Sequence, residues 1–138
     1  MDIRNLIEEL IEEHQNYIQK MKDFEKRLES DFSEEVLEDI LKFLETDIQE
    51  HARKEEENLN EEVEGKFPDF DSQAIKFAHD VIDEAIEDLK WEISLNDKKN
   101  HDKVIKQIKK IFSMIKDHFL EEENFLFPNV YKEKKEWI

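Results

Sequence analysis

Hydrophobic side chains recur along four segments of this chain at alternating steps of three and four residues. This spacing is typical of the inward face of an amphipathic helix in a helical bundle. In the first two segments this face consists of Ile3, Ile7, Leu10, His14, Tyr17, Met21, Phe24 and Leu28, and of Leu37, Leu41, Leu44, Ile48, His51, Glu55, Leu59 and Val63. In the last two it consists of Ile75, His79, Ile82, Ile86, Leu89 and Ile93, and of Val104, Ile108, Ile111, Ile115, His118, Glu122 and Phe125. The pattern predicts four helices.

The expected limits of these helices follow from capping and breaking residues. We expect helices over about residues 2–30, 33–64, 72–95 and 100–127, followed by a short C-terminal tail. Asp31 or Ser33 can cap the second helix, Gly65 can end it, Ser72 can cap the third, and Pro128 stops the fourth. Because the connections between long helices are short, the predicted fold class is all-α, an antiparallel up-down-up-down four-helix bundle.

Composition supports one helical domain over residues 1–138, with a single glycine and two prolines. The formal net charge of −17 argues against nucleic acid as a partner, because phosphate binding needs clustered lysine and arginine. There is no cysteine, which excludes a disulfide framework or a thiolate metal site. The first residues lack the layout of a secretory signal, and no apolar run reaches membrane-spanning length. We therefore expect a cytoplasmic protein without a membrane partner.

Six positions of the inward faces carry polar residues where hydrophobic ones are expected. They are His14, His51, Glu55, His79, His118 and Glu122. Measured from the predicted turns near residues 31 and 98, each histidine lies about 16–18 residues along its helix, or roughly 24–27 Å. The four histidines are thus predicted to meet at one depth. His101, at the start of the last helix, fails this test and is expected at the surface.

The second and fourth helices carry the same local motif, a histidine followed four and five residues later by two glutamates. The helical repeat places the first glutamate of each pair, Glu55 and Glu122, in the inward face and turns Glu56 and Glu123 away from it. Two ionised carboxylates about 4–5 Å apart repel by roughly 3–4 kcal/mol at an effective dielectric constant near 20. Their burial adds a further desolvation penalty.

A bound metal is the simplest partner for this group, since no lysine or arginine occupies the inward faces at the same level. Imidazole and carboxylate together suit iron, manganese or zinc, and carboxylates able to bridge suit two ions. The alternative without metal is a polar core with protonated glutamates. A ferritin-type site needs Glu-x2-His pairs, which are absent, and a bis-histidine haem leaves both glutamates unexplained.

At these residues the whole chain resembles the hemerythrin-like, HHE cation-binding family. The shared pattern is one histidine on the first helix, His-x3-Glu on the second, one histidine on the third, and His-x3-Glu-Glu followed by Leu126–Pro128 on the fourth. The resemblance implies a non-haem di-iron centre with an oxo or hydroxo bridge. It implies terminal ligands at His14, His51, His79 and His118, and bridging carboxylates at Glu55 and Glu122.

The sequence departs from the oxygen-carrying members at two places. They have His-x3-His on the third helix, where this chain has His79-x3-Asp83, and an aspartate five residues after the last histidine, where it has Glu123. The site is poorer in nitrogen donors, which puts reversible oxygen carriage in doubt. Asp83 is a seventh candidate ligand, although it could instead hydrogen-bond His79 or face solvent. Tyr17, one turn from His14, could reach the metals or only pack.

The leading functional hypothesis is a protein that handles O2, NO or iron through its two irons, by binding, sensing or storage. Apolar residues expected around the centre favour small neutral ligands, and they are Ile48, Ile82, Ile86, Ile115 and Phe119. Two alternatives stay open: an iron-donating protein of the iron–sulfur-cluster repair type, and a metal-free helical interaction module. No nucleophile or phosphate-binding loop indicates an enzymatic reaction.

Overall fold

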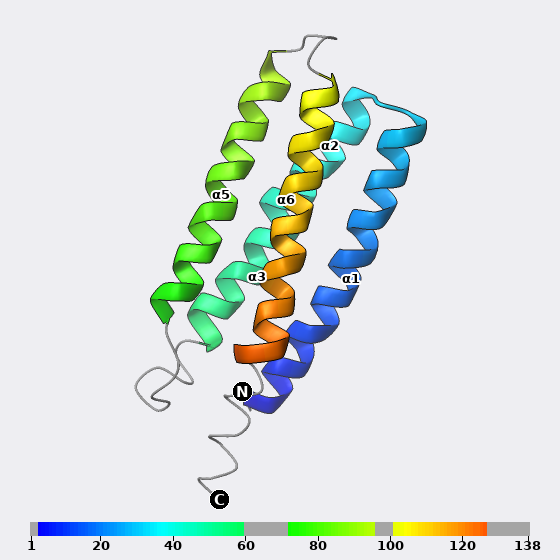
Figure 1. Cartoon of the computed structure of the whole chain (residues 1–138). Coiled ribbons are helices and arrows are strands. Elements are labelled where there is room, and N and C mark those ends of the chain that lie inside the picture. Colours follow the sequence, from blue (N-terminus) through cyan, green and yellow to red (C-terminus); the bar gives the residue numbers. More distant parts are fainter. Residues whose placement is uncertain (1–2, 60–71, 96–100, 127–138) are drawn as a thin grey trace, which may run out of the picture.

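The computed structural model describes residues 3–59, 72–95 and 101–126, and within these ranges every regular element is a helix. The elements are α1 (Ile3–Ser30), α2 (Glu34–Phe43), η1 (Leu44–Ile48), α3 (Gln49–Lys54), η2 (Glu55–Leu59), α5 (Ser72–Ser94), α6 (His101–Glu121) and η4 (Glu122–Leu126). The stretch from α2 to η2 is continuous, and η4 continues α6. Figure 1 shows that the resulting long helical segments lie side by side. The predicted all-α class is confirmed.

The turn after α1 follows from the chemistry of Ser33. Its backbone is extended, with φ −134° and ψ 163°, and its side chain accepts a hydrogen bond from the amide of Val36 at 3.4 Å. Glu34 and Glu35 occupy the first turn of α2, where negative charge favours the helix N-terminus. Ser33 is therefore the cap, rather than Asp31. The other predicted ends, at 64–65 and 128, and the segments 66–71, 96–100 and 129–138 lie outside the described residues.

Three short stretches, η1, η2 and η4, have the wider π-helical turn. Glu55 is the first residue of η2, and Glu122 is the first residue of η4. Single π-helical turns inside α-helices are frequent at functional sites. The hydrophobic spacing of the sequence did not indicate these turns.

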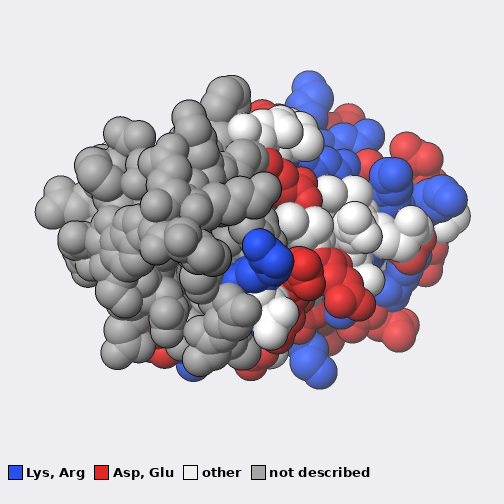
Figure 2. All heavy atoms as spheres, turned by 90° about the horizontal axis from the view of Figure 1, so that it is seen from below, with Lys and Arg blue, Asp and Glu red and all other residues white. Residues whose placement is uncertain are grey.

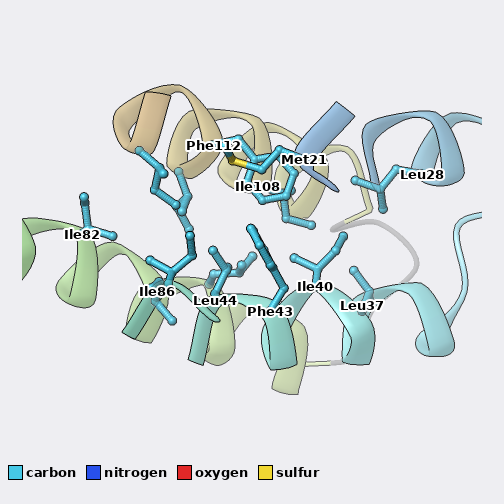
Figure 3. Packing of buried hydrophobic residues seen from close by; sticks show 14 of the residues in the cluster. Met21, Leu28, Leu37, Ile40, Phe43, Leu44, Ile82, Ile86, Ile108 and Phe112 are labelled. Carbon is cyan, nitrogen blue, oxygen red and sulfur yellow. The ribbon is translucent and has the colours of Figure 1, made fainter. Parts of the chain in front are cut away.

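Hydrophobic residues of all the long helical segments form one buried cluster (Figure 3). The cluster includes Met21, Leu28, Leu37, Ile40, Phe43, Leu44, Ile82, Ile86, Leu89, Ile108, Phe112 and Ile115. Leu6, Ile7 and Leu10 are also buried, on the opposite side of His14 along α1. His14 therefore lies between two apolar stretches of α1, and a buried imidazole there is shielded from water.

Figure 2 shows one face of the protein, on which lysines and arginines of the described residues are interspersed with acidic residues. Some of these charges join neighbouring helices, as in the contacts of Lys20 with Asp47 at 2.7 Å and of Lys90 with Glu45 at 2.9 Å. Such exposed pairs contribute little to stability individually. Among the described helices, none combines the length and the hydrophobicity that a membrane span requires.

Candidate metal centre

The six polar residues of the inward faces meet at one point inside the protein. His14, His51, Glu55, His79 and Glu122 are all buried, and the His118 side chain is 11% exposed. They come from every long helical segment: His14 from α1, His51 and Glu55 from α3 and η2, His79 from α5, and His118 and Glu122 from α6 and η4. The equal depth expected from the sequence is thus found in the structure.

Their donor atoms form two overlapping groups. In the first, which we call the four-donor group, one atom each of His14, His51, Glu55 and Glu122 lies within 4.8 Å of the others. In the second, the three-donor group, the same limit holds for Glu55, His79 and His118. Glu55 belongs to both groups, so the arrangement offers two adjacent cation positions that share a carboxylate.

Glu55 turns its two oxygens toward different groups. Its Oε1 lies 2.6 Å from Nε2 of His51, and its Oε2 lies 3.8 Å from Nε2 of His79. A carboxylate in this position can give one oxygen to each of two ions.

Glu122 also lies between the two groups. Its Oε1 is 3.4 Å from Nε2 of His14 and 3.4 Å from Nε2 of His118. Because this one oxygen is close to a histidine of each group, Glu122 can reach either cation position or both.

The Nε2 atoms of the histidines face one another in pairs. This distance is 3.0 Å between His14 and His51, and 3.2 Å between His79 and His118. Each pair can be joined by a single proton, since a neutral imidazole donates through one nitrogen and accepts through the other. All four Nε2 atoms thus point into the centre, where they can bind a cation once those protons leave.

The outer nitrogens of two histidines are held by carboxylates. Nδ1 of His51 lies 3.1 Å from Oε1 of Glu13, and Nδ1 of His79 lies 3.1 Å from Oε1 of Glu56. A carboxylate on Nδ1 orients the ring, fixes its tautomer and makes Nε2 a stronger metal ligand.

A third outer carboxylate, Glu123, has its Oε1 3.7 Å from Nδ1 of His14. The helical spacing predicted that Glu56 and Glu123 face away from the inward side of their own helix. It gave no indication that each then reaches a histidine of a neighbouring helix, and none of the role of Glu13. The sequence did offer one sign of these contacts, because a second glutamate directly follows both Glu55 and Glu122.

Glu13 is itself held by further donors at the surface. Nζ of Lys54 lies 2.8 Å from its Oε2, and the hydroxyl of Tyr17 donates to its Oε1 at 3.4 Å. Lys54 also contacts Glu9. Burial raises the pKa of Glu13, but hydrogen bonds from His51 and Lys54 outweigh it and lower the pKa to about 2. Glu13 is therefore an anion under ordinary conditions.

Burial and neighbouring charges divide the protons of the centre unequally. Burial, and then the charge of Glu55, raises the pKa of Glu122 well above its usual value. Burial also opposes ionisation of Glu55, but its contacts with Glu122 and His51 lower its pKa. Burial disfavours the charged form of His51, yet Glu13 and Glu55 raise its pKa to about 9. Without metal, the proton shared by the two buried carboxyls is thus favoured on Glu122. Glu55 is then the anion, and it faces the protonated His51.

Two other histidines of the centre, His14 and His118, are neutral. Burial, followed by the charge of His51, lowers the pKa of His14 to about 3. Burial likewise lowers the pKa of His118 to about 4. Neutral imidazole is the form that binds a metal ion, so both side chains are prepared for ligation without losing a proton to solvent.

The carboxylates show how well this group suits a cation. No oxygen of Glu55 or Glu122 has a hydrogen-bond donor in suitable geometry within the part of the chain that the structure describes. No lysine or arginine is among the buried residues of that part. Of these four oxygens, Oε1 of Glu55 lies 2.6 Å from Nε2 of His51, and buried carboxylate oxygens without a hydrogen-bond donor are costly in a protein interior. Imidazole nitrogens and carboxylate oxygens together form a donor set for iron, manganese or zinc. A bound cation of this kind would remove the cost of burying the carboxylates.

Three residues singled out in the sequence lie outside both donor groups. Oδ1 of Asp83 accepts a hydrogen bond from the side-chain amide of Gln49, so its proposed role as a ligand stays a prediction. The Tyr17 hydroxyl is engaged with Glu13. His101 is exposed, as predicted.

A small cavity of about 20 Å³ adjoins the centre. His51, His79 and His118 line one part of it, and the remaining lining residues are Ile48, Gln49, Ala52, Ile82, Asp83, Ile115 and Phe119. A cavity of this size holds about one water-sized molecule. The apolar residues expected around the centre are thus found beside it, with the exception of Ile86, which does not line this cavity.

Comparisons with protein-family models, with curated proteins and with solved structures found no match for this chain.

Proposed function

We propose that this chain is a hemerythrin-like protein, an up-down-up-down four-helix bundle that holds two iron ions among its helices. The course of the long helical segments in Figure 1 supports the bundle, because successive segments lie side by side and α1 reverses into α2 through only three residues. The donor set supports two ions rather than one, because two groups of ligands share a residue.

The observation that carries this proposal is the position of Glu55. Its two oxygens face histidines of different groups, 2.6 Å from His51 and 3.8 Å from His79. A site for a single ion has no need of a buried carboxylate turned in two directions. His14 and His51 would hold one ion, His79 and His118 the other, and Glu55 and Glu122 would lie between them. Asp83 could join only by leaving Gln49.

Iron is the metal that the resemblance to the HHE family favours within the set that the donors permit. When bound, a ferrous pair supplies reversible electron transfer and affinity for O2 and NO. The residues of this chain contribute orientation through Glu13 and Glu56, exclusion of water through burial, and a cavity that admits only small molecules. We therefore propose that the protein acts in the binding, sensing or storage of O2, NO or iron.

Iron donation is the second candidate, and the donor count favours it. Within the 4.8 Å limit the three-donor group offers its cation fewer ligands than the four-donor group, so if Glu122 binds the ion at His14 rather than the one at His118, the second iron is expected to leave more easily. Gas binding and iron release are separated by following absorption spectra under O2 or NO and, in parallel, the transfer of iron to a chelator.

Metal analysis of the purified chain tests the proposal directly. We expect two irons per chain, near-ultraviolet absorption from the bridged pair, and a melting temperature that falls when iron is chelated. Glu55→Ala should abolish this absorption while the helical content stays, and Glu57→Ala, a change at an exposed neighbour, should leave both unchanged. Failure to find stoichiometric metal, with melting insensitive to chelation, would support the metal-free interaction module instead.

A further inference from the structure

We propose that the outer face of α5 is a docking site for an amphipathic helix of another protein, one that has apolar residues in its first and last turns and lysine or arginine between them. This face lies on the side of α5 away from His79. The inference therefore goes beyond the proposed metal function and does not depend on it.

α5 carries a second regular stripe of residues besides its inward one. The steps between its members are four, three, four, three and four positions, and this outer stripe consists of Phe77, Val81, Glu84, Asp88, Trp91 and Leu95. At 3.6 residues per turn, its centre lies about 160° around the helix from the inward stripe. α5 ends at Ser94, but the amide of Leu95 donates to the carbonyl of Glu92 at 3.3 Å, so the turn includes Leu95.

The four apolar residues of the outer stripe are exposed to solvent. The exposed fraction is 70% for Phe77, 67% for Trp91, 48% for Leu95 and 38% for Val81. In the described part of the chain only one other large hydrophobic residue is exposed, Leu120 on α6. In Figure 1 the other described helices all lie on one side of α5. Large apolar side chains gathered on one exposed face indicate a surface for another protein.

Two carboxylates occupy the middle of the outer stripe. Glu84 and Asp88 are both exposed, and neither forms an ion pair with another residue that the structure describes. The nearest lysine along α5, Lys90, is engaged with Glu45 at 2.9 Å. The outer stripe is thus apolar, acidic and apolar in turn. A partner with complementary charge has a basic middle between two apolar ends.

The same carboxylates argue against a second copy of this chain as the occupant. Antiparallel pairing of two outer stripes would bring the apolar residues of one end against those of the other, but it would also place Glu84 against Asp88 at two points. Parallel pairing would place each carboxylate against its own copy. Like charges that face each other where two helices meet oppose association, whereas lysine or arginine at these positions forms ion pairs.

The test uses the full-length chain and two synthetic helical peptides that span the stripe, which is about 27 Å long from Phe77 to Leu95. The probe has leucine at the outer seam positions and lysine at the two central ones. The control peptide has the same composition, with its lysines moved to the ends. By calorimetry, the probe should bind about tenfold or more tightly than the control peptide. The indole N–H signal of Trp91 should shift in nuclear magnetic resonance spectra when the probe binds.

Substitutions in the apolar part of the stripe should weaken this binding. Phe77→Ser and Trp91→Ser should each lower the affinity for the probe by about tenfold or more. Both side chains are largely exposed, so the helical content should not change. Leu120→Ser, at the exposed leucine of α6, is the matched control and should bind the probe as the unchanged chain does.

Reversal of the central charge should reverse the preference. The Glu84→Lys, Asp88→Lys double variant should bind a third peptide, with glutamate at the two central positions, about tenfold more tightly than it binds the lysine probe. The control is Glu8→Lys, Glu12→Lys, the same change at two exposed positions four residues apart on α1, which should keep the preference for the lysine probe.

Equal binding of the probe and the control peptide, or a preference that charge reversal at Glu84 and Asp88 leaves unchanged, would overturn the inference. A dimer of the unchanged chain that Phe77→Ser abolishes would also overturn it, because a second copy would then occupy the face. Probe binding that is seen only after residues 127–138 are removed would overturn it as well, because the occupant would then be part of this chain. Metal analysis tests the proposed iron centre separately from these outcomes.

Discussion

Nδ1 of His51 lies 3.1 Å from Oε1 of Glu13, a contact that joins α3 to α1 and extends the centre to the protein surface. Glu13 is ionised because His51, Lys54 and Tyr17 all donate to it. Its charge strengthens the His51 ring as a metal ligand and holds that ring in place. Glu13 therefore belongs to the candidate metal centre, although it directly precedes His14 in the chain.

Glu13→Gln should lower the affinity for one of the two irons by about 10–100-fold, the usual effect of losing a carboxylate behind a ligating histidine. The amide keeps the shape of the side chain, so the helical content should not change. Stepwise titration with ferrous iron measures the effect. Glu12→Gln is the control, because Glu12 is exposed on the same turn of α1. Equal iron affinities of these two variants would show that Glu13 has no role in metal binding.

The pH dependence of stability in the metal-free protein provides a second measure of this pair. The pKa of Glu13 falls from its ordinary value of 4.5 to about 2 on folding, so its stabilisation is present above pH 4.5 and lost as the pH falls through 2. The pKa of His51 rises from 6.5 to about 9, so its contribution is complete below pH 6.5 and lost as the pH rises through 9.

The destabilisation caused by Glu13→Gln should therefore be largest between about pH 4.5 and 6.5 and shrink on either side of this window. Urea unfolding of both chains across the pH range measures the difference in the free energy of unfolding. A difference that stays constant from pH 3 to 9 would contradict the assignment of opposite charges to Glu13 and His51.

The inner residues were predictable from the sequence because a buried polar residue breaks an otherwise apolar spacing. The spacing predicted that His14 and Glu55 lie in the interior and at which depth they meet. The all-α class followed from the same spacing. It did not find Glu13 or Glu56, since the spacing tells only whether a side chain faces inward from its own helix. Which neighbouring side chain an outward residue meets depends on how the helices pack, and one sequence does not specify that.

The π-helical turns that begin at Glu55 and Glu122 were missed for a related reason. A π-helical turn rotates the following residues by a fraction of a helical turn. The alternation of three- and four-residue steps tolerates such a rotation, so the pattern does not reveal it. The hydrogen bond of Asp83 with Gln49 likewise joins α5 to α3, and the sequence offered three roles for Asp83 without a means of choosing among them.

Iron binding should release protons from the centre. Without metal, His51 has a pKa of about 9, and that of Glu122 is raised by burial and by Glu55, so both carry a proton that a cation must displace. The apparent affinity for ferrous iron should therefore increase as the pH rises from 6 to 8. Calorimetric titration in buffers of different ionisation enthalpy counts the protons released, and a count of zero would contradict this description of the metal-free centre.

Glu122→Gln should make the metal-free protein more stable and the iron-loaded protein less stable than the unchanged chain. In the absence of metal, Glu122 is a buried carboxyl whose oxygens have no donor among the described residues, next to the charge of Glu55. The amide is neutral at every pH and can donate to Glu55, whereas the carboxyl is neutral only while it keeps its proton, so we expect the amide to raise the melting temperature by a few degrees, or about 1 kcal/mol, at alkaline pH, where the carboxyl ionises.

With iron bound, the order should reverse, because an amide is a poorer ligand than a carboxylate and cannot balance the charge of the cations. The rise in melting temperature on adding iron should then be smaller in Glu122→Gln than in the unchanged chain. Glu121→Gln, a change at an exposed position on the preceding residue, is the control for the general effect of removing one negative charge from this acidic surface. Side chains that destabilise the empty centre and stabilise the metal-bound centre are expected at a metal-binding site. If Glu122→Gln destabilised both forms equally, Glu122 would be a structural residue and the assignment to the centre would fail.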